Sequence, residues 1–189
     1  MMDIRLNILN PFVDKFIVCE SRYSHSGKEK DIKFNKKDFP QFEEKITHLI
    51  LDKEPSDIIK KDNLNTLELR LNSVSRIKEQ RNFIGNSLKD YSSEDYVVYS
   101  DNDEIPNLEQ FDLRKNRKKI VIFNQKLFYY KFNLSLPNID WFGSKACKIK
   151  NLKNIDLLRA IKNKKYQFYR FDTCFSDIKH QSVNIVLDG

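Results

Sequence analysis

The sequence predicts an α/β fold, because short apolar runs alternate with helix-like stretches along most of the chain. The runs are rich in β-branched and aromatic residues, as buried strands are. The helix-like stretches carry apolar residues three and four positions apart. With 189 residues, 40% of them hydrophobic, the chain can bury one core, so we expect a single domain over residues 1–189.

The first half of the chain contains three predicted strands and three predicted helices. We expect helices at residues 3–9, 38–45 and 66–89, and strands at residues 12–20, 46–51 and 96–100. The longest helix carries an apolar stripe, which predicts a side that faces the core. Its members are Leu67, Leu71, Val74, Ile77, Ile84 and Leu88. Arg81 falls on that side, where a guanidinium needs an anionic or acceptor partner.

The second half contains further strands and one clear helix. We expect a helical turn at residues 108–113, strands at residues 120–123 and 125–134, and a helix at residues 154–162 with Ile155, Leu158 and Ile161 inward. Residues 183–187 form a last apolar run. Together with the first half, this order gives a sheet flanked by helices.

Cysteine usage and hydropathy point to a soluble cytoplasmic chain. Cys19, Cys147 and Cys174 are widely spaced and odd in number, which favours free thiols in a reducing compartment over disulfides or a zinc site. His48 lies inside an apolar run, so we expect a packed core residue. The chain contains neither a signal-peptide core nor an apolar run long enough to cross a bilayer.

The net charge of +7 comes from 34 basic and 27 acidic residues, and one basic cluster stands out. Its members are Arg114, Lys115, Arg117, Lys118 and Lys119. Such a cluster could contact nucleic acid or an anionic membrane surface, or it could be a solvated loop. Because no nucleic-acid-binding signature accompanies it, we do not expect nucleic acid as a partner, and a peripheral membrane contact stays open.

The strand at residues 96–100 ends in a group of carboxylates. In extended geometry Asp101 and Asp103 would point one way, and Asn102 and Glu104 the other. Two carboxylates that converge repel each other unless a cation lies between them, and hard oxygen ligands suit Mg²⁺ or Mn²⁺. An acidic turn without a metal is the alternative, since Asp and Asn are common turn residues.

Aromatic residues and a glycine follow at residues 128–143. The single tryptophan, Trp141, lies between Asp140 and Gly143. Sugars are often bound by an aromatic face together with a carboxylate, so Tyr130, Trp141 and Gly143 are candidate acceptor-binding residues. A core position for Trp141 is the equal alternative.

Five segments, in order along the chain, resemble the family 17 glycosyltransferases, which include the bisecting β-1,4-N-acetylglucosaminyltransferases acting on mannose of N-glycans. The segments are Arg-Leu-Asn at 5–7, Val-Asp-Lys-Phe-Ile-Val-Cys-Glu-Ser at 13–21, Gln-Arg-Asn at 80–82, Ser-Asp-Asn-Asp-Glu-Ile-Pro at 100–106 and Trp-Phe-Gly-Ser-Lys-Ala at 141–146. Relative to the family pattern, a first strand and a C-terminal Gly-Trp-His segment are expected to be missing.

The resemblance implies a GT-A-type, Rossmann-like fold with a mostly parallel central sheet, and inverting transfer of N-acetylglucosamine from UDP-N-acetylglucosamine with Mn²⁺ or Mg²⁺. It implies a metal site at Asp101 and Asp103, which form a DxD motif. The donor would contact Glu20, Ser21, Arg81, Asn82 and Asp101.

An inverting transfer also needs a general base for the acceptor hydroxyl. Glu104 and Asp140 are the two candidates. A module that binds nucleotide sugars or glycans without catalysis is the alternative function, and a basic nucleic-acid-binding protein is a third hypothesis.

Overall fold

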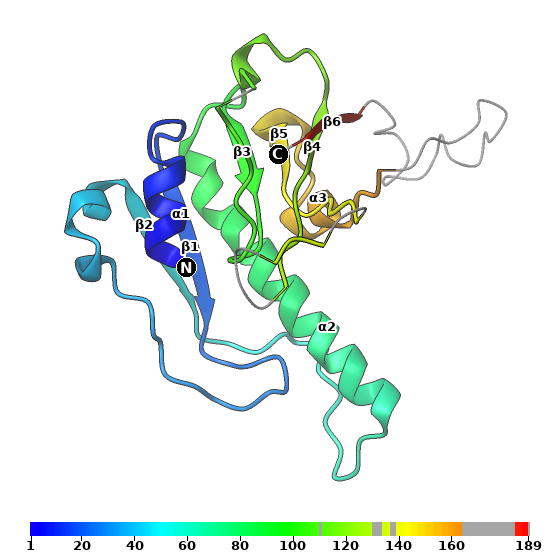
Figure 1. Cartoon of the computed structure of the whole chain (residues 1–189). Coiled ribbons are helices and arrows are strands. Elements are labelled where there is room, and N and C mark those ends of the chain that lie inside the picture. Colours follow the sequence, from blue (N-terminus) through cyan, green and yellow to red (C-terminus); the bar gives the residue numbers. More distant parts are fainter. Residues whose placement is uncertain (110, 130–133, 137–138, 164–183, 189) are drawn as a thin grey trace, which may run out of the picture. The chain divides into compact units, whose positions relative to one another are not determined.

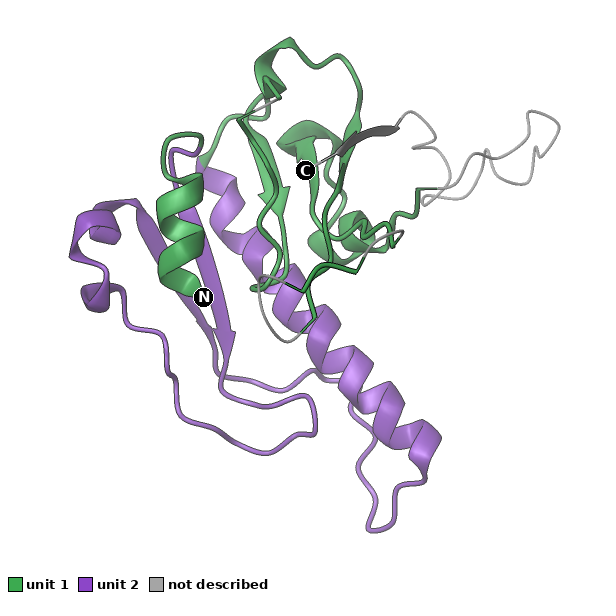
Figure 2. Cartoon of the chain, in the orientation of Figure 1, with its two compact units in different colours: residues 1–12, 91–189 green, residues 13–90 purple. Residues whose placement is uncertain are grey.

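The computed structural model describes residues 1–109, 111–129, 134–136, 139–163 and 184–188, the last of these by backbone alone. The chain forms two compact units, shown in different colours in Figure 2. Unit 1 combines residues 1–12 with residues 91–189, and unit 2 contains residues 13–90. Each unit is described by itself below. The expected single domain stays a prediction.

Unit 2 is built on two parallel strands, β1 (Phe16–Ser21) and β2 (Ile46–Leu51), which pair in register from Phe16↔Ile46 to Ser21↔Leu51. The predicted strand at residues 46–51 is confirmed with the same bounds. The segment expected to be a helix at residues 38–45 forms two short 3₁₀ helices instead, η1 (Lys36–Asp38) and η2 (Pro40–Lys45). His48 packs edge-on against Phe34, but its Nε2 is buried and has no hydrogen-bond partner among the described residues.

The long helix of unit 2 is α2 (Thr66–Phe83), and a 3₁₀ helix, η3 (Ile84–Asp90), follows it. A capping box fixes its start, because Asn65 and Glu68 each accept a hydrogen bond from the other's backbone N–H. The predicted core-facing stripe is wrong over its first half, since Leu67, Leu71 and Val74 are all more than half exposed.

The side chain that α2 does bury is polar. Asn72 is 3% exposed and exchanges two hydrogen bonds with the backbone of Ile59, at 2.8 and 2.9 Å. Both of its polar ends are therefore satisfied, and the loop before α2 is held against the helix.

Unit 1 begins with α1 (Met2–Leu9), close to the predicted helix, and contains a four-stranded sheet. Its strands are β3 (Tyr96–Tyr99), β4 (Ile120–Asn124), β5 (Lys145–Lys148) and β6 (Asn184–Asp188), in the spatial order β3-β5-β4-β6 (Figure 1). Strand β5 runs antiparallel to both β3 and β4, and only β4 and β6 are parallel. The expected mostly parallel central sheet is therefore wrong. The difference is β5, which the sequence did not predict because it is not an apolar run.

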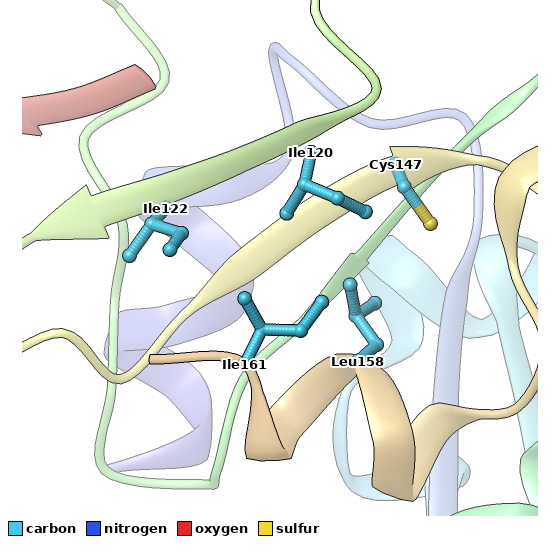
Figure 3. Close-up of a cluster of buried hydrophobic side chains, with 5 residues drawn as sticks. All are labelled: Ile120, Ile122, Cys147, Leu158 and Ile161. Atoms are coloured by element: carbon cyan, nitrogen blue, oxygen red, sulfur yellow. The ribbon is translucent and has the colours of Figure 1, made fainter. Parts of the chain in front are cut away.

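The core of unit 1 lies between the sheet and the short helix α3 (Ile155–Ala160). Figure 3 shows Leu158 and Ile161 pointing at Ile120, Ile122 and Cys147 of the two inner strands. Asn154 caps α3 by accepting a hydrogen bond from Leu157 N at 2.8 Å. The predicted inward positions Ile155, Leu158 and Ile161 are confirmed, each at most 4% exposed. This packing sets where α3 ends and hence where Arg159 lies.

Two further 3₁₀ segments, η4 (Leu113–Lys115) and η5 (Ile149–Asn151), flank the inner strands. The helical turn expected at residues 108–113 is reduced to one turn, closed by a hydrogen bond from Phe111 N to Leu108 O at 3.4 Å, and η4 begins at Leu113. No helix in the described residues combines the length and the apolar character needed to cross a membrane. The structure is thus mixed α/β, with one parallel and one mainly antiparallel sheet.

Candidate functional site

A tight turn follows β3 and places two carboxylates together. Glu104 N donates to Asp101 O at 3.1 Å, and Asp101 N donates to Glu104 Oε2 at 3.1 Å. The strand alternation expected over these residues is wrong, because β3 ends at Tyr99 and the chain reverses. Asp101 and Glu104 therefore converge, while Asn102 and Asp103 are exposed at the tip of the turn.

The cation between the two carboxylates is the guanidinium of Arg159, from the end of α3. Its Nη2 lies 2.9 Å from both Asp101 Oδ2 and Glu104 Oε1, and its Nε lies 3.2 Å from Asp101 Oδ2. The Glu104 and Arg159 side chains are only 4% and 17% exposed. Two converging carboxylates did require a cation, and a side chain of the chain itself supplies it.

Neutral donors and a second arginine complete this arrangement. Tyr99 Oη donates to Asp101 Oδ1 at 2.9 Å, and Trp141 Nε1 donates to Glu104 Oε1 at 2.8 Å. Arg5, from α1, donates to the backbone oxygens of Asp101 and Glu104. Burial lowers the pKa of the Arg5 guanidinium below its usual value, against the opposing effect of the nearby Glu104 carboxylate. We call Arg5, Tyr99, Asp101, Glu104, Trp141 and Arg159 the carboxylate cluster.

A buried lysine ties the two sides of the cluster together. Lys145 is 1% exposed, and its Nζ donates to the carbonyls of Phe142, Gly143 and Arg159 at 2.9–3.1 Å. A buried ammonium must be satisfied in this way, since an unpaired one is costly. The single side chain thus holds the segment that carries Trp141 against the end of α3 that carries Arg159.

Gly143 is where the cluster leaves no room for a side chain. A Cβ there would overlap the Glu104 carboxyl and lie 2.5 Å from Trp141 Nε1. We expect Gly143→Ala to break the hydrogen bond between Trp141 and Glu104 and to lower the free energy of unfolding by about 1–3 kcal/mol. Trp141 is the only tryptophan, so its fluorescence reports directly on this bond.

Gly85 offers the matched control for that substitution. A Cβ at Gly85 would meet nothing within 4 Å. Gly85→Ala should therefore leave both the emission spectrum and the unfolding midpoint close to those of the unsubstituted chain. Equal, small effects of the two alanines would show that the contact at Gly143 is not tight.

Asp103 is the carboxylate of this turn that faces solvent. Within the described residues, no group of three or more His, Cys, Asp or Glu side chains could hold a metal. Asp103 nevertheless fits a divalent cation of the Mg²⁺ type, which is commonly bound by one or two carboxylates plus substrate phosphates and water. Asp101 fits less well, because both of its oxygens already accept hydrogen bonds from Tyr99 and Arg159.

The remaining predicted donor residues lie in unit 2, at the end of β1 and the last turn of α2. Glu20 accepts hydrogen bonds from Lys30 Nζ at 2.9 Å, Phe34 N at 3.0 Å and Lys33 N at 3.1 Å. Burial raises the pKa of the Glu20 carboxyl, but these hydrogen bonds outweigh it and hold the pKa below its usual value. Glu20 therefore fixes the loop that follows β1.

Ser21 and the end of α2 are also set by local contacts. Ser21 is buried and accepts a hydrogen bond from Tyr23 N at 3.1 Å. Gln80 Nε2 donates to Cys19 O at 3.0 Å, which holds α2 beside β1. Arg81 and Asn82, one and two residues further on, are half-buried. The contacts of the donor candidates in unit 2 with a nucleotide stay a prediction.

We expect Glu20→Gln to lower the free energy of unfolding by about 1–3 kcal/mol near neutral pH, because Lys30 Nζ, Lys33 N and Phe34 N lose their charged acceptor. The depressed pKa means that the contribution of Glu20 is present above the ordinary carboxyl pKa and is lost as the pH falls. The stability difference from the unsubstituted chain should therefore shrink on acidification.

Thermal unfolding across acidic pH and tryptic cleavage at Lys28, Lys30 and Lys33 would check this expectation. Glu29→Gln is the matched control, since Glu29 is exposed in the same loop. The expectation is contradicted if the difference in unfolding free energy between Glu20→Gln and the unsubstituted chain stays constant as the pH falls.

The other predicted site residues divide into three groups. Glu104, Asp101, Trp141 and Gly143 are brought together in unit 1. Asp140 is exposed nearby in the chain, and its Oδ1 accepts a hydrogen bond from Asn124 Nδ2 at 3.0 Å. Tyr130 lies outside the described residues.

Sequence reasoning assigned no role in the site to Arg5, Tyr99, Lys145 or Arg159. For Arg159 a signal was present, because it is the only charged residue in the apolar stretch at residues 157–161, whose neighbours Leu158 and Ile161 face the core. An arginine at the end of such a stretch needs an anionic partner. Arg5 and Lys145 lie in two of the segments that resemble the family, at residues 5–7 and 141–146, but the resemblance implied no role for either side chain.

Comparison with models of known protein families gives a match. A sequence model of the family described as Glycosyltransferase family 17 matches residues 1–159. No curated protein and no solved structure matches the chain significantly. The matched range contains every residue of the carboxylate cluster and every predicted site residue.

Proposed function

The chain belongs to glycosyltransferase family 17, and we propose that it is a metal-dependent inverting enzyme with a GT-A-type fold. Its donor in this proposal is UDP-N-acetylglucosamine, and its acceptor is a glycan such as an N-glycan. The observation that carries the proposal is the turn after β3, which presents Asp103 to solvent on a backbone held from behind by the carboxylate cluster.

This geometry separates the roles of the acidic residues. Asp101 and Glu104 are both bound to Arg159, so in this proposal the carboxylate that meets a cation and the donor diphosphate is that of Asp103. A divalent cation held there would neutralise the charge that develops on the diphosphate as it leaves. Because hydrogen bonds fix the turn in advance, Asp103 would need little rearrangement to bind.

For the general base, the geometry favours Asp140 over Glu104. A base must reach the acceptor hydroxyl, and the Glu104 side chain is 4% exposed with both oxygens accepting hydrogen bonds. Asp140 is exposed, and Asn124 orients its carboxylate. In this proposal Asp140 takes the proton from the acceptor, and Glu104 positions Trp141 and Arg159.

The acceptor would lie against Trp141. Its indole Nε1 is anchored to Glu104, yet the residue is 41% exposed, so its orientation is fixed while part of it remains accessible. A fixed aromatic surface next to an exposed carboxylate suits a sugar ring, whose C–H groups pack on the aromatic face. Glu20, Ser21, Arg81 and Asn82 would border the nucleotide.

Calorimetric titration with UDP-N-acetylglucosamine, with and without Mn²⁺, tests donor binding, and release of UDP in the presence of a glycan acceptor tests transfer. The proposal expects binding that depends on Mn²⁺ and turnover that depends on the acceptor. Binding without turnover would favour the alternative of a module that binds nucleotide sugars without catalysis. Absence of UDP-sugar binding under both conditions would overturn the proposal.

A further inference from the structure

A concave site of unit 1 lies away from the carboxylate cluster. It is a pocket of about 710 Å³ at the end of the sheet where β3 begins. The loop at residues 114–119, which leads into β4 (Figure 1), supplies five of its cationic side chains, and Lys148 and Lys150 supply two more. We call it the basic pocket.

The basic pocket is separated from the candidate donor site by the length of a strand. Tyr96, which lines the pocket, starts β3 and pairs with Lys148. The strand ends at Tyr99, whose hydroxyl is bonded to Asp101. A ligand in the basic pocket would therefore occupy the opposite end of β3 from a donor at the Asp103 turn.

Uncharged groups hold the shape of the pocket. Tyr96 Oη donates to Asn116 O at 3.3 Å. The Asn116 side chain donates to Lys118 O at 2.9 Å and accepts from Lys118 N at 3.0 Å. Backbone and amide contacts thus fold the loop, and of its five cationic side chains only Lys115 forms an ion pair among the described residues.

The charges of the pocket are far from balanced. Among the described residues, no acidic side chain lines it. Two carboxylates next to it form ion pairs with its cations: Asp112 with Lys115 at 3.6 Å, and Glu94 with both Lys148 and Lys150 at 2.9 and 2.6 Å. Among the described residues, the pocket thus has seven cationic side chains and two neighbouring carboxylates that pair with them. Like charges this crowded repel one another, and a bound anion would relieve that repulsion.

We propose that the basic pocket binds a compact anion that carries several phosphate groups, either as a lipid headgroup or as a free solute. Arg114 and Arg117 can each offer two parallel N–H groups to phosphate oxygens. The volume lies in the range of small-molecule sites. An extended nucleic acid fits less well, because Lys148 Nζ lies 5.7 Å from the centre of the Tyr96 ring, which leaves that ring a poor platform for base stacking.

Calorimetric titration with inorganic tripolyphosphate, in buffer without divalent cations, tests this proposal. Arg114→Gln combined with Arg117→Gln should weaken binding at least about tenfold, because two bidentate donors are lost. The matched control is Lys28→Gln combined with Lys37→Gln, which removes the same charge at exposed positions of unit 2 and should change affinity less than about twofold. All four positions are exposed, so the unfolding midpoints should be unchanged.

Two further binding measurements identify whether the phosphates belong to a lipid headgroup or to a free solute. Vesicles of phosphatidylcholine with and without phosphatidylinositol bisphosphate test the lipid headgroup. Selective binding to the phosphorylated vesicles, reversed by tripolyphosphate, would assign the lipid source, and tripolyphosphate binding alone would assign a free solute. Saturating UDP should not displace tripolyphosphate, since the donor site lies at the other end of β3.

The proposal is overturned if tripolyphosphate and the vesicles both fail to bind, or if the two double variants lose affinity equally. It is also overturned if a single-stranded oligonucleotide binds more tightly than tripolyphosphate, with an affinity that falls steeply with salt. That result would assign the loop at residues 114–119 to nucleic acid.

Discussion

Arg159→Met is expected to lower the free energy of unfolding by about 3–5 kcal/mol, since it leaves a buried carboxylate without its cation. Glu104 is 4% exposed on its side chain, and Arg159 Nη2 bonds both Glu104 and Asp101 at 2.9 Å. Methionine keeps the apolar stem of the side chain but cannot neutralise either group. For a chain of this length, the unfolding midpoint should fall by about 6–20 °C.

Two further variants make this prediction specific. Arg70→Met is the matched control, because Arg70 is exposed on α2, and it should change the midpoint by little. Adding Glu104→Gln to Arg159→Met removes the more deeply buried of the two charges that lose Arg159, and it should restore part of the lost stability. If Arg159→Met is no more destabilising than Arg70→Met, or if the double variant is less stable than Arg159→Met, the guanidinium is not what stabilises the cluster.

The parts of the fold that were predictable depend on neighbours close in sequence. Strands β2 and β4 are short apolar runs, and α3 has three buried residues at helical spacing, so local pattern was enough. Strand β5 was missed because half of its four residues are lysines. Its first residue, Lys145, can be buried only because three carbonyls accept its hydrogen bonds, two from the residues just before β5 and one from Arg159 at the end of α3.

The prediction that the first half of the apolar stripe of α2 faces the core was wrong for a related reason. Helical spacing of Leu67, Leu71 and Val74 shows that one side of the helix is apolar, but it does not show that another element covers that side. Periodicity is a property of one segment, whereas burial needs a partner. The sequence therefore predicted the helix and where it begins, but it did not predict that the apolar side of its first half is exposed.

The candidate site was predictable in composition but not in geometry. The sequence identified Asp101, Asp103, Glu104 and Trp141, and it identified the need for a cation. It placed the acidic residues on an extended strand, although Asp and Asn favour the turn that is observed. The cation is Arg159, more than fifty residues away, and no local pattern could have paired it with Asp101.

Asp103→Ala should abolish Mn²⁺-dependent binding of UDP-N-acetylglucosamine, with a loss of about a hundredfold or more in affinity and transfer. Asp103 is exposed at the tip of the turn, so its carboxylate is available to a cation and its removal should not affect folding. Asn102→Ala is the matched control, because Asn102 is the neighbouring exposed residue of the same turn.

Asp101→Ala should differ from both Asp103→Ala and Asn102→Ala, since it removes the partner of Arg159 and Tyr99 and so should also lower the unfolding midpoint. Calorimetry with and without Mn²⁺, alongside thermal unfolding of all three variants, separates these effects, and donor binding by Asp103→Ala as tight as that of Asn102→Ala would exclude Asp103 as a metal ligand.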